Sequence, residues 1–158
     1  MTTGADGRTM KTVLVSACLL GEACRYDGAS RPSEVVKRFC EENEVIPVCP
    51  EVMGGLPTPR DPSERVGERV VSCSGHDVTE QYVCGAQLTL EKAREVGAQL
   101  AILKAKSPSC GAGMIYDGTF TGHLVAGNGV TAELLAAHGI TVLTEDELDF
   151  GRPSSPCG

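Results

Sequence analysis

The sequence has no tryptophan, few other aromatic residues and no long apolar run. Aromatic side chains make up only 4% of its 158 residues. Proteins that bind single-stranded nucleic acid, by contrast, rely on aromatic rings that stack on the bases. A membrane-spanning helix needs at least about 18 consecutive apolar residues, and the sequence has no such run. These absences argue against a nucleic-acid stacking platform and against a membrane partner.

Positive charge is in deficit as well. The 14 Lys and Arg residues are outnumbered by 21 Asp and Glu residues, which gives a formal net charge of −7 and a pI near 4.9. A broad basic face for nucleic acid is therefore not expected, and a small neutral or weakly acidic ligand fits better. The segment MTTGADGRTM has neither the apolar core nor the cleavage site of a signal peptide, so we expect a cytoplasmic protein.

The apolar pattern predicts strands and helices in alternation. Short β-branched runs predict four strands, within KTVLVSACLLG, EVIPVCPE, AQLAILKAKS and ITVLTEDEL. Helical spacing predicts three helices, within RPSEVVKRFCEEN, TEQYVCGAQLTLEKAREVG and GVTAELLAAHG. We expect Thr79 to cap the long middle helix and Gly139 to follow the last helix as its C′ residue. The apolar side of the middle helix is expected to carry Val83, Leu88, Ala93 and Val96.

This order of elements predicts one α/β domain, because strand–helix–strand units build parallel sheets wrapped by helices. We expect a mostly parallel sheet of about four strands flanked by helices, Rossmann-like or flavodoxin-like, with a small β-hairpin around Ser74 and Gly75. The domain is expected over residues 11–150, between a disordered lead-in at 1–10 and a polar tail at 151–158. The loop MGGLPTPRDPSE and the Gly-rich loop or loose hairpin GMIYDGTFTGHLVAGNG are long enough to suggest function.

The eight cysteines are the most informative feature. In a reducing cytosol, clustered cysteines indicate metal sites or reactive thiols more often than disulfides. Cys18 and Cys49 fall at the carboxyl ends of the first two predicted strands, and Cys110 falls just past the third. Ligands of open α/β sheets bind in the crevice beyond the carboxyl ends of the strands. We therefore expect these three thiols to converge on one crevice.

What such thiols hold is not fixed by their position. Structural zinc sites commonly use cysteine pairs two to four residues apart, and the sequence has none. Three cysteines with one coordination position left open suit an iron–sulfur cluster that acts as a Lewis acid. A single cysteine, however, is more often a small buried hydrophobe, which is what we expect of Cys40 and Cys84. Cys24, in the first loop, is a further thiol within reach of the crevice.

Polar residues accompany two of the three cysteines. Glu51 lies two residues after Cys49, where a carboxylate either directs a water as a general base or makes a helix cap or salt bridge. Ser107 and Ser109 lie on either side of Pro108, just before Cys110. Their hydroxyls either contact a ligand or cap the next turn.

Four blocks of the sequence resemble the 2-thiouracil desulfidase family, long catalogued as a domain of unknown function. The blocks are LVSACLLGEACRYDG, VCPEVMGGLPTPRDPSE, AILKAKSPSCG and IYDGTFTG. The resemblance implies a 4Fe-4S cluster on Cys18, Cys49 and Cys110, with one iron left open for sulfur. It also implies catalytic roles for Glu51 and Ser107. A cysteine at position 24 is not a fixed feature of the family, and a fourth thiolate from it would close the cluster.

The implied reaction is a hydrolytic, non-redox removal of sulfur from a thiolated nucleobase such as 2-thiouracil, giving uracil and hydrogen sulfide. The open iron would bind the sulfur, Glu51 would direct a water, and Ser107 would hold the ring or the developing charge. Arg60 is a candidate contact to the substrate or an anion. Three rival hypotheses are a cluster- or metal-binding sensor or carrier, a thiol enzyme with Cys110 as nucleophile, and a desulfidase of thiouridine in tRNA, as in longer relatives.

Overall fold

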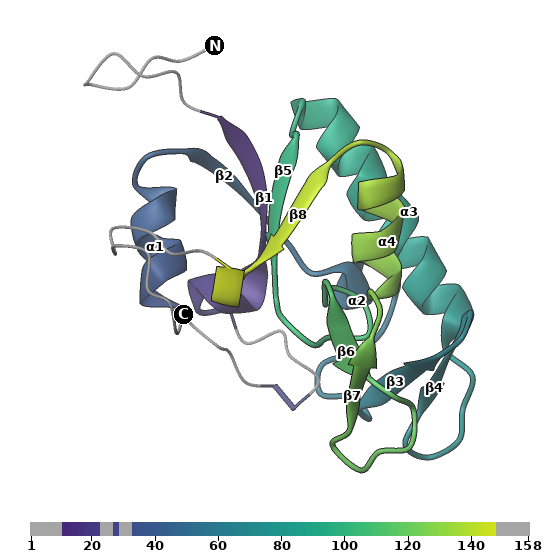
Figure 1. The fold of residues 1–158 in the computed structure, drawn as a ribbon. Coiled ribbons are helices and arrows are strands. Elements are labelled where there is room, and N and C mark those ends of the chain that lie inside the picture. The colour runs from purple at the N-terminus through teal and green to yellow at the C-terminus, as the bar shows by residue number, and fades with distance from the viewer. Residues whose placement is uncertain (1–10, 23–26, 29–32, 148–158) are drawn as a thin grey trace.

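The computed structural model describes residues 11–22, 27–28 and 33–147. Its centre is a four-stranded sheet in the order β2-β1-β5-β8 (Figure 1), in which every neighbouring pair is parallel. The strands are β1 (Thr12–Ser16), β2 (Glu44–Val48), β5 (Leu100–Leu103) and β8 (Thr141–Thr144). The predicted α/β class and mostly parallel sheet are confirmed. The predicted lead-in and tail lie outside the described residues.

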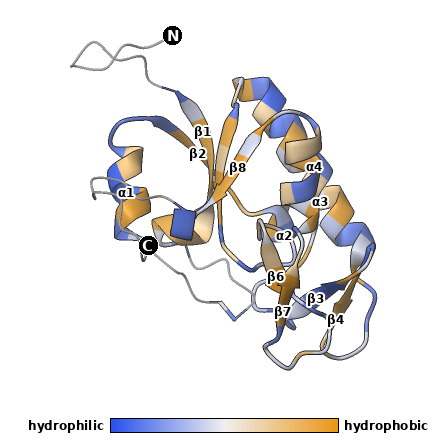
Figure 2. Ribbon diagram, viewed as in Figure 1, coloured by the Kyte–Doolittle hydropathy of each residue, from blue (hydrophilic) through white to orange (hydrophobic). Residues whose placement is uncertain are grey.

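Helices cover both faces of this sheet. They are α1 (Glu34–Cys40), α2 (Pro50–Met53), α3 (Thr79–Val96) and α4 (Val130–Ala137), with short 3-10 helices η1 (Ala17–Leu20) and η2 (Glu145–Glu147). In β1, Leu14 packs in the core on the α3 and α4 side, whereas Val13 and Val15 pack on the α1 side. This alternation follows from the two-residue period of a strand. Figure 2 shows the apolar and polar sides of α1 and α3 that result. None of the described helices is long and apolar enough to cross a membrane.

The buried side of α3 differs from the predicted one. Val83 and Leu88 are each 39% exposed, while Tyr82 and Leu90 are buried. The buried residues recur every three or four positions, at Tyr82, Gly85, Ala86, Thr89, Leu90 and Ala93. Of the four expected residues, Ala93 is buried and Val96 is partly buried against the same core, whereas Val83 and Leu88 are exposed. The small residues at 85 and 86 let the helix approach its neighbours on the buried side.

Two helix ends were predicted from capping residues, the start of α3 and the end of α4, and only the second is as predicted. Thr79 is not the N-cap of α3, since its backbone N–H instead donates to Asp77 Oδ1 at 2.9 Å and its Oγ1 accepts the N–H of Val70 at 2.9 Å. Thr79 is the first residue of the helix, and the Asp77 carboxylate two residues earlier accepts its N–H. At the other end of the chain, Gly139 follows α4 with φ +82°, the left-handed C′ conformation that was predicted.

Two antiparallel hairpins lie beyond the carboxyl ends of the parallel strands (Figure 1). One pairs β3 (Ser63–Val66) with β4 (Arg69–Ser72), and the other pairs β6 (Met114–Tyr116) with β7 (Leu124–Ala126). The first turns at residues 67–68, not at Ser74 and Gly75 as predicted. The chain does turn there, but only one bridge, between Val71 and Asp77, forms across that turn. The second hairpin occupies the predicted Gly-rich segment.

Candidate functional site

A cavity of about 760 Å³ opens at the carboxyl ends of the parallel strands. The three expected cluster ligands and the two expected catalytic residues all line it: Cys18, Cys49, Cys110, Glu51 and Ser107. They come from three separate segments, after β1, β2 and β5, that the parallel sheet brings to one edge. The expected convergence of the three cysteines on one cavity is therefore what the structure has.

Two of the thiols follow directly from strand ends. Cys18 lies in η1, the turn after β1, and is 7% exposed. Cys49 follows β2 and is the N-cap of α2, whose first residue is Pro50. Proline suits a first helical position because it lacks the N–H that would be unpaired there. The Met53 N–H closes the turn on the Cys49 carbonyl at 2.9 Å. Both thiols are thus fixed by the backbone that leaves the sheet.

Cys110 is held by a tight turn that Ser107 organises. The Ser107 Oγ accepts the backbone N–H of Ser109 at 3.1 Å and of Cys110 at 3.0 Å. The Ser107 carbonyl accepts the N–H of Gly111 at 2.8 Å. Because both acceptor positions of the hydroxyl are occupied, its proton is the part left to donate to another group. Ser107 therefore caps the turn and still lines the cavity.

The amino end of α4 clamps this turn from behind. The N–H groups of Val130 and Thr131 donate to the carbonyls of Pro108 and Ser109, each at 2.9 Å. Ser109 is fully buried, and its hydroxyl pairs with that of Thr131 at 2.8 Å. A methyl group on Gly129 would overlap the backbone of Ser109. Ser109 is thus part of the clamp and does not line the cavity.

The buried environment of Cys110 controls its chemistry. Burial raises the pKa of the Cys110 thiol to about 12, a hydrogen bond from Ser16 opposes the rise, and the nearby charge of Glu51 adds to it. The Ser16 Oγ lies 3.6 Å from Cys110 Sγ and also accepts the Lys104 N–H at 2.9 Å. A thiol that is protonated at neutral pH is a poor nucleophile. A bound cationic centre would favour the thiolate instead.

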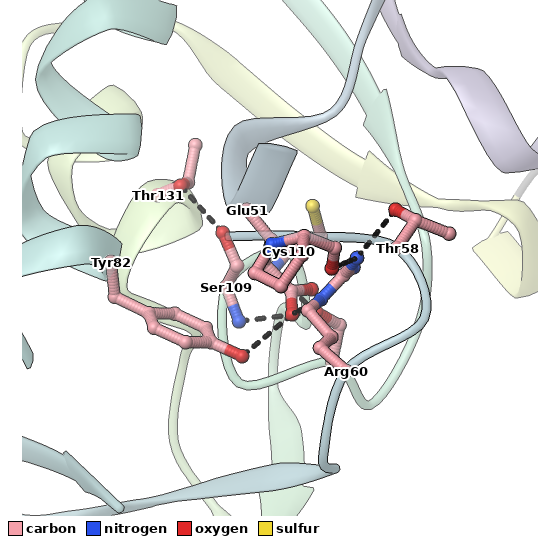
Figure 3. Close-up of polar contacts among 9 residues, drawn as sticks. Glu51, Thr58, Arg60, Tyr82, Ser109, Cys110 and Thr131 are labelled. Atoms are coloured by element: carbon pink, nitrogen blue, oxygen red, sulfur yellow. Dashed lines mark hydrogen bonds and ion pairs between the residues drawn. The ribbon is translucent and has the colours of Figure 1, made fainter. Parts of the chain in front are cut away.

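Glu51 sits in a partly buried network of donors (Figure 3). Its Oε1 accepts the Tyr82 hydroxyl at 2.6 Å and the Arg60 Nε at 3.2 Å. Arg60, with only 5% of its side chain exposed, also donates to the Pro57 carbonyl at 3.1 Å and the Thr58 Oγ1 at 3.0 Å. Glu51 therefore makes the salt bridge that was one of its expected roles, and both residues of this ion pair line the cavity. Arg60 pairs with Glu51, so its expected role as a substrate contact stays a prediction.

The contact between α2 and α3 sets Glu51 beside Tyr82. Gly54 and Gly85 face each other where α2 crosses α3, and a methyl group on Gly85 would overlap the Pro50 carbonyl. Burial, followed by the charge of Glu51, raises the pKa of Tyr82 well above its usual range. The protonated Tyr82 hydroxyl is therefore the donor to the carboxylate in this pair. Sequence reasoning missed Tyr82, because a tyrosine inside an amphipathic helix looks like any other core residue.

A second ion pair borders the cavity. Lys104 Nζ lies 2.9 Å from Glu145 Oε2, and Glu145 Oε1 accepts the Ala105 N–H at 2.7 Å. This pair joins the end of β5 to η2, and both of its residues line the cavity. Neither residue was singled out from the sequence, where each reads as one more surface charge.

The remaining cysteines stay away from the cavity or outside the described residues. Cys73 and Cys84 are exposed, so Cys84 is not the buried hydrophobe that was expected. Cys40 is half-buried against the α1 side of the core, and burial raises its pKa. Cys24 and Cys157 lie outside the described part of the chain.

The donor set fits an iron–sulfur cluster better than a single ion. Within the described residues, no three His, Cys, Asp or Glu side chains lie close enough to hold one metal ion. Three thiols do line one cavity, and a cubane cluster is held at its corners by thiolates that lie farther apart than the ligands of one ion. Soft thiolates are also the ligands that such clusters prefer.

Comparison with known proteins agrees with this geometry. Residues 13–147 match the family model described as 2-thiouracil desulfurase. The uncharacterized protein YbbK of Bacillus subtilis (strain 168) is 45% identical over 147 residues, which are 87% of this chain and 97% of that protein. A solved structure described as a [4Fe-4S]-dependent thiouracil desulfidase, TudS, is 49% identical with a TM-score of 0.83, covering 87% of this chain and 93% of the other.

Proposed function

The chain belongs to the 2-thiouracil desulfurase family, and we propose that it is a 4Fe-4S-dependent desulfidase that removes sulfur hydrolytically from a thiolated nucleobase such as 2-thiouracil. One observation carries the proposal: three thiols, a carboxylate and a serine hydroxyl from separate segments line one cavity. The likeness to the TudS structure supports it.

In this proposal, Cys18, Cys49 and Cys110 hold the cluster. When bound, the cluster supplies an open, Lewis-acidic iron for the sulfur of the substrate. The three thiols lie on backbone that is fixed by β1, by β2 and α2, and by the clamp from α4. A rigid donor set of this kind suits a cofactor that must keep one position open.

Glu51 is the proposed general base. Its carboxylate lines the cavity and is oriented through Oε1 by Tyr82 and Arg60. It would take one proton from a water whose oxygen adds to the ring carbon that carries the sulfur. The carbon–sulfur bond then breaks, and the sulfur leaves with a proton as hydrosulfide. One water replaces one sulfur, so no oxidant or reductant is consumed.

Ser107 is proposed to hold the substrate during this exchange. Its hydroxyl oxygen is already occupied by two N–H donors, so its own proton points to an acceptor. A ring carbonyl, or negative charge developing on the ring during attack, would provide that acceptor.

A free base is the preferred substrate class over tRNA. The net charge of −7 leaves no excess of positive charge for a long polyanion. Of the three basic residues that line the cavity, Arg60, Lys104 and Lys106, the first two are paired with glutamates. Desulfidation of thiouridine in tRNA therefore remains the second candidate, and a carrier or sensor that binds the cluster without turnover is the third.

The test is anaerobic reconstitution with iron and sulfide, followed by sulfide release from 2-thiouracil. Glu51→Gln should keep the iron content and cluster absorbance, but lower kcat by about 10²–10⁴-fold, the usual effect of losing a general base. Glu95→Gln is the matched control, because Glu95 lies on the exposed side of α3 and pairs only weakly with Lys92 at 3.5 Å.

Each other outcome points to a different function. A cluster that forms in the wild type without any sulfide release would favour the sensor or carrier. Release from thiolated tRNA but not from the free base would favour the RNA substrate. Full activity of Glu51→Gln would remove Glu51 from the mechanism.

A further inference from the structure

The 117–120 loop between β6 and β7 holds an exposed aromatic residue at the cavity in a strained backbone conformation. Phe120 lines the cavity, is 39% exposed and has φ +58°. A bulky side chain seldom adopts this left-handed region, and such residues persist only where the surrounding structure enforces them. The folded protein thus keeps a phenyl ring at the cavity wall without burying it in the core.

A buried carboxylate enforces this conformation. Glu64, on β3, is 9% exposed, and its Oε1 accepts the backbone N–H of Gly118 at 2.9 Å and of Phe120 at 3.1 Å. A carboxylate is costly to bury without partners, and here its partners are two N–H groups of one loop. Asp117 tightens the same loop by accepting the Thr119 N–H at 2.9 Å. The conformation of this loop between β6 and β7 therefore depends on a carboxylate from the other hairpin.

The position of the ring suggests what it contacts. The cavity has thiols and Glu51 on the sheet side, and Phe120 and Tyr116 on the hairpin side. Flat heterocyclic bases bind to proteins by stacking on aromatic rings, and this contact tolerates any base that has a π-face. In a chain with 3 Phe and 3 Tyr in all, two of these rings at one cavity wall are a large share.

We propose that Phe120 is a specificity-determining residue that stacks on the ring of the thiolated base, and that Glu64 is the positioning residue that keeps it there. The inference rests on the proposed desulfidase function and extends it by assigning recognition of the aromatic ring to the hairpin side. It predicts that aromaticity of the substrate, and not only its thiocarbonyl group, is recognised.

The test compares 2-thiouracil with 5,6-dihydro-2-thiouracil, which has the same thiocarbonyl, carbonyl and N–H groups on a puckered ring. Phe120→Leu should raise KM for 2-thiouracil about tenfold, the size of effect expected for one base–aromatic stack. KM for the dihydro compound should change less than twofold, and kcat should stay within twofold for both. Met114→Leu is the control, because Met114 on β6 is 44% exposed and does not line the cavity.

Glu64 is tested by a conservative and a disruptive change. Glu64→Gln keeps an acceptor oxygen for the two N–H groups and should retain the wild-type KM. Glu64→Ala removes the acceptor and should raise KM as Phe120→Leu does, with thermal unfolding measured in parallel. Should Glu64→Ala fail to fold, Phe120→Leu still decides the proposal, since Phe120 is at the surface.

Binding of uracil, followed by saturation-transfer NMR on the wild type and Phe120→Leu, separates this inference from the proposed function. Phe120-dependent binding of uracil without sulfide release from 2-thiouracil would refute the desulfidase but support the stacking residue. Sulfide release with the same KM in wild type and Phe120→Leu would refute the stacking residue alone. A KM increase of equal size for both substrates would also overturn it, and a wild type that neither binds uracil nor releases sulfide would overturn both.

Discussion

The two walls of the cavity are built in different ways. The strand-end wall, defined as Cys18, Cys49, Glu51, Ser107 and Cys110, extends from the parallel sheet. The hairpin wall, defined as Glu64, Tyr116 and Phe120, belongs to the antiparallel hairpins and their loop. The first wall carries side chains able to bind metal or move protons. The second carries aromatic rings and one carboxylate that is used for the loop itself.

The two walls also differ in how their side chains are held in place. Parallel strands buried on both faces give fixed backbone at their ends, and the three cysteine segments each have further backbone hydrogen bonds close by. The hairpin strands are three or four residues long, and the loop between β6 and β7 is held by the carboxylate of Glu64 from the other hairpin. The proposed chemistry is thus assigned to side chains held by the parallel sheet, and the proposed recognition of a flat ring to a side chain held in place by one buried carboxylate.

The largest expected effect comes from breaking the strand-end wall at a thiol. Cys110→Ser should lower the reconstituted iron content, because a serine oxygen is a harder ligand than the thiolate that such clusters prefer, and sulfide release should fall to background. Iron and sulfide analysis after anaerobic reconstitution measures it. Cys73→Ser is the control, as Cys73 is exposed. A Cys110→Ser protein with full iron content would show that Cys110 is not a cluster ligand.

The next effect tests the clamp behind Cys110. Gly129→Ala should lower the free energy of unfolding by about 1–3 kcal/mol, since the added methyl group overlaps backbone that has no room to move. Gly127→Ala, whose methyl group would lie at 3.4 Å from Ile115 Cδ1, should change it by less than about 0.5 kcal/mol. Urea unfolding of both variants provides the measurement. Equal stability of the two would mean that the turn is not pressed against α4.

The smallest effect concerns the orientation of Glu51. Tyr82→Phe removes the donor at 2.6 Å but leaves Arg60 at 3.2 Å, so kcat should fall about tenfold, near 1.4 kcal/mol, while KM and cluster content stay the same. Tyr116→Phe, on the hairpin wall, is the matched control and should leave kcat unchanged. A kcat that is as insensitive to Tyr82→Phe as to Tyr116→Phe would mean that Tyr82 plays no part in placing the carboxylate.

Part of the fold and of the candidate site could be predicted from the sequence, and particular residues show why the rest could not. The α3 face was misjudged because Val83 and Leu88 are apolar but lie beside the small-residue stripe at 85 and 86, which packs closer. Thr79 was expected to be the N-cap of α3, but it is the first residue of the helix and donates its N–H to Asp77. Both errors have the same origin. Sequence reasoning assigns a role from the residue type, whereas in the folded protein the shape of the neighbouring elements decides which residue takes that role.

The sequence by itself determined the class of the protein and the meeting place of its thiols. Apolar runs specify parallel strands, and parallel strands put their carboxyl ends, with Cys18, Cys49 and Cys110, at one edge. Only the tertiary structure decided that Tyr82 orients Glu51 and that Glu64 holds Phe120 at the cavity. These pairs lie 31 and 56 residues apart in the chain. Their contacts depend on how helices and hairpins pack, and no local pattern encodes that packing.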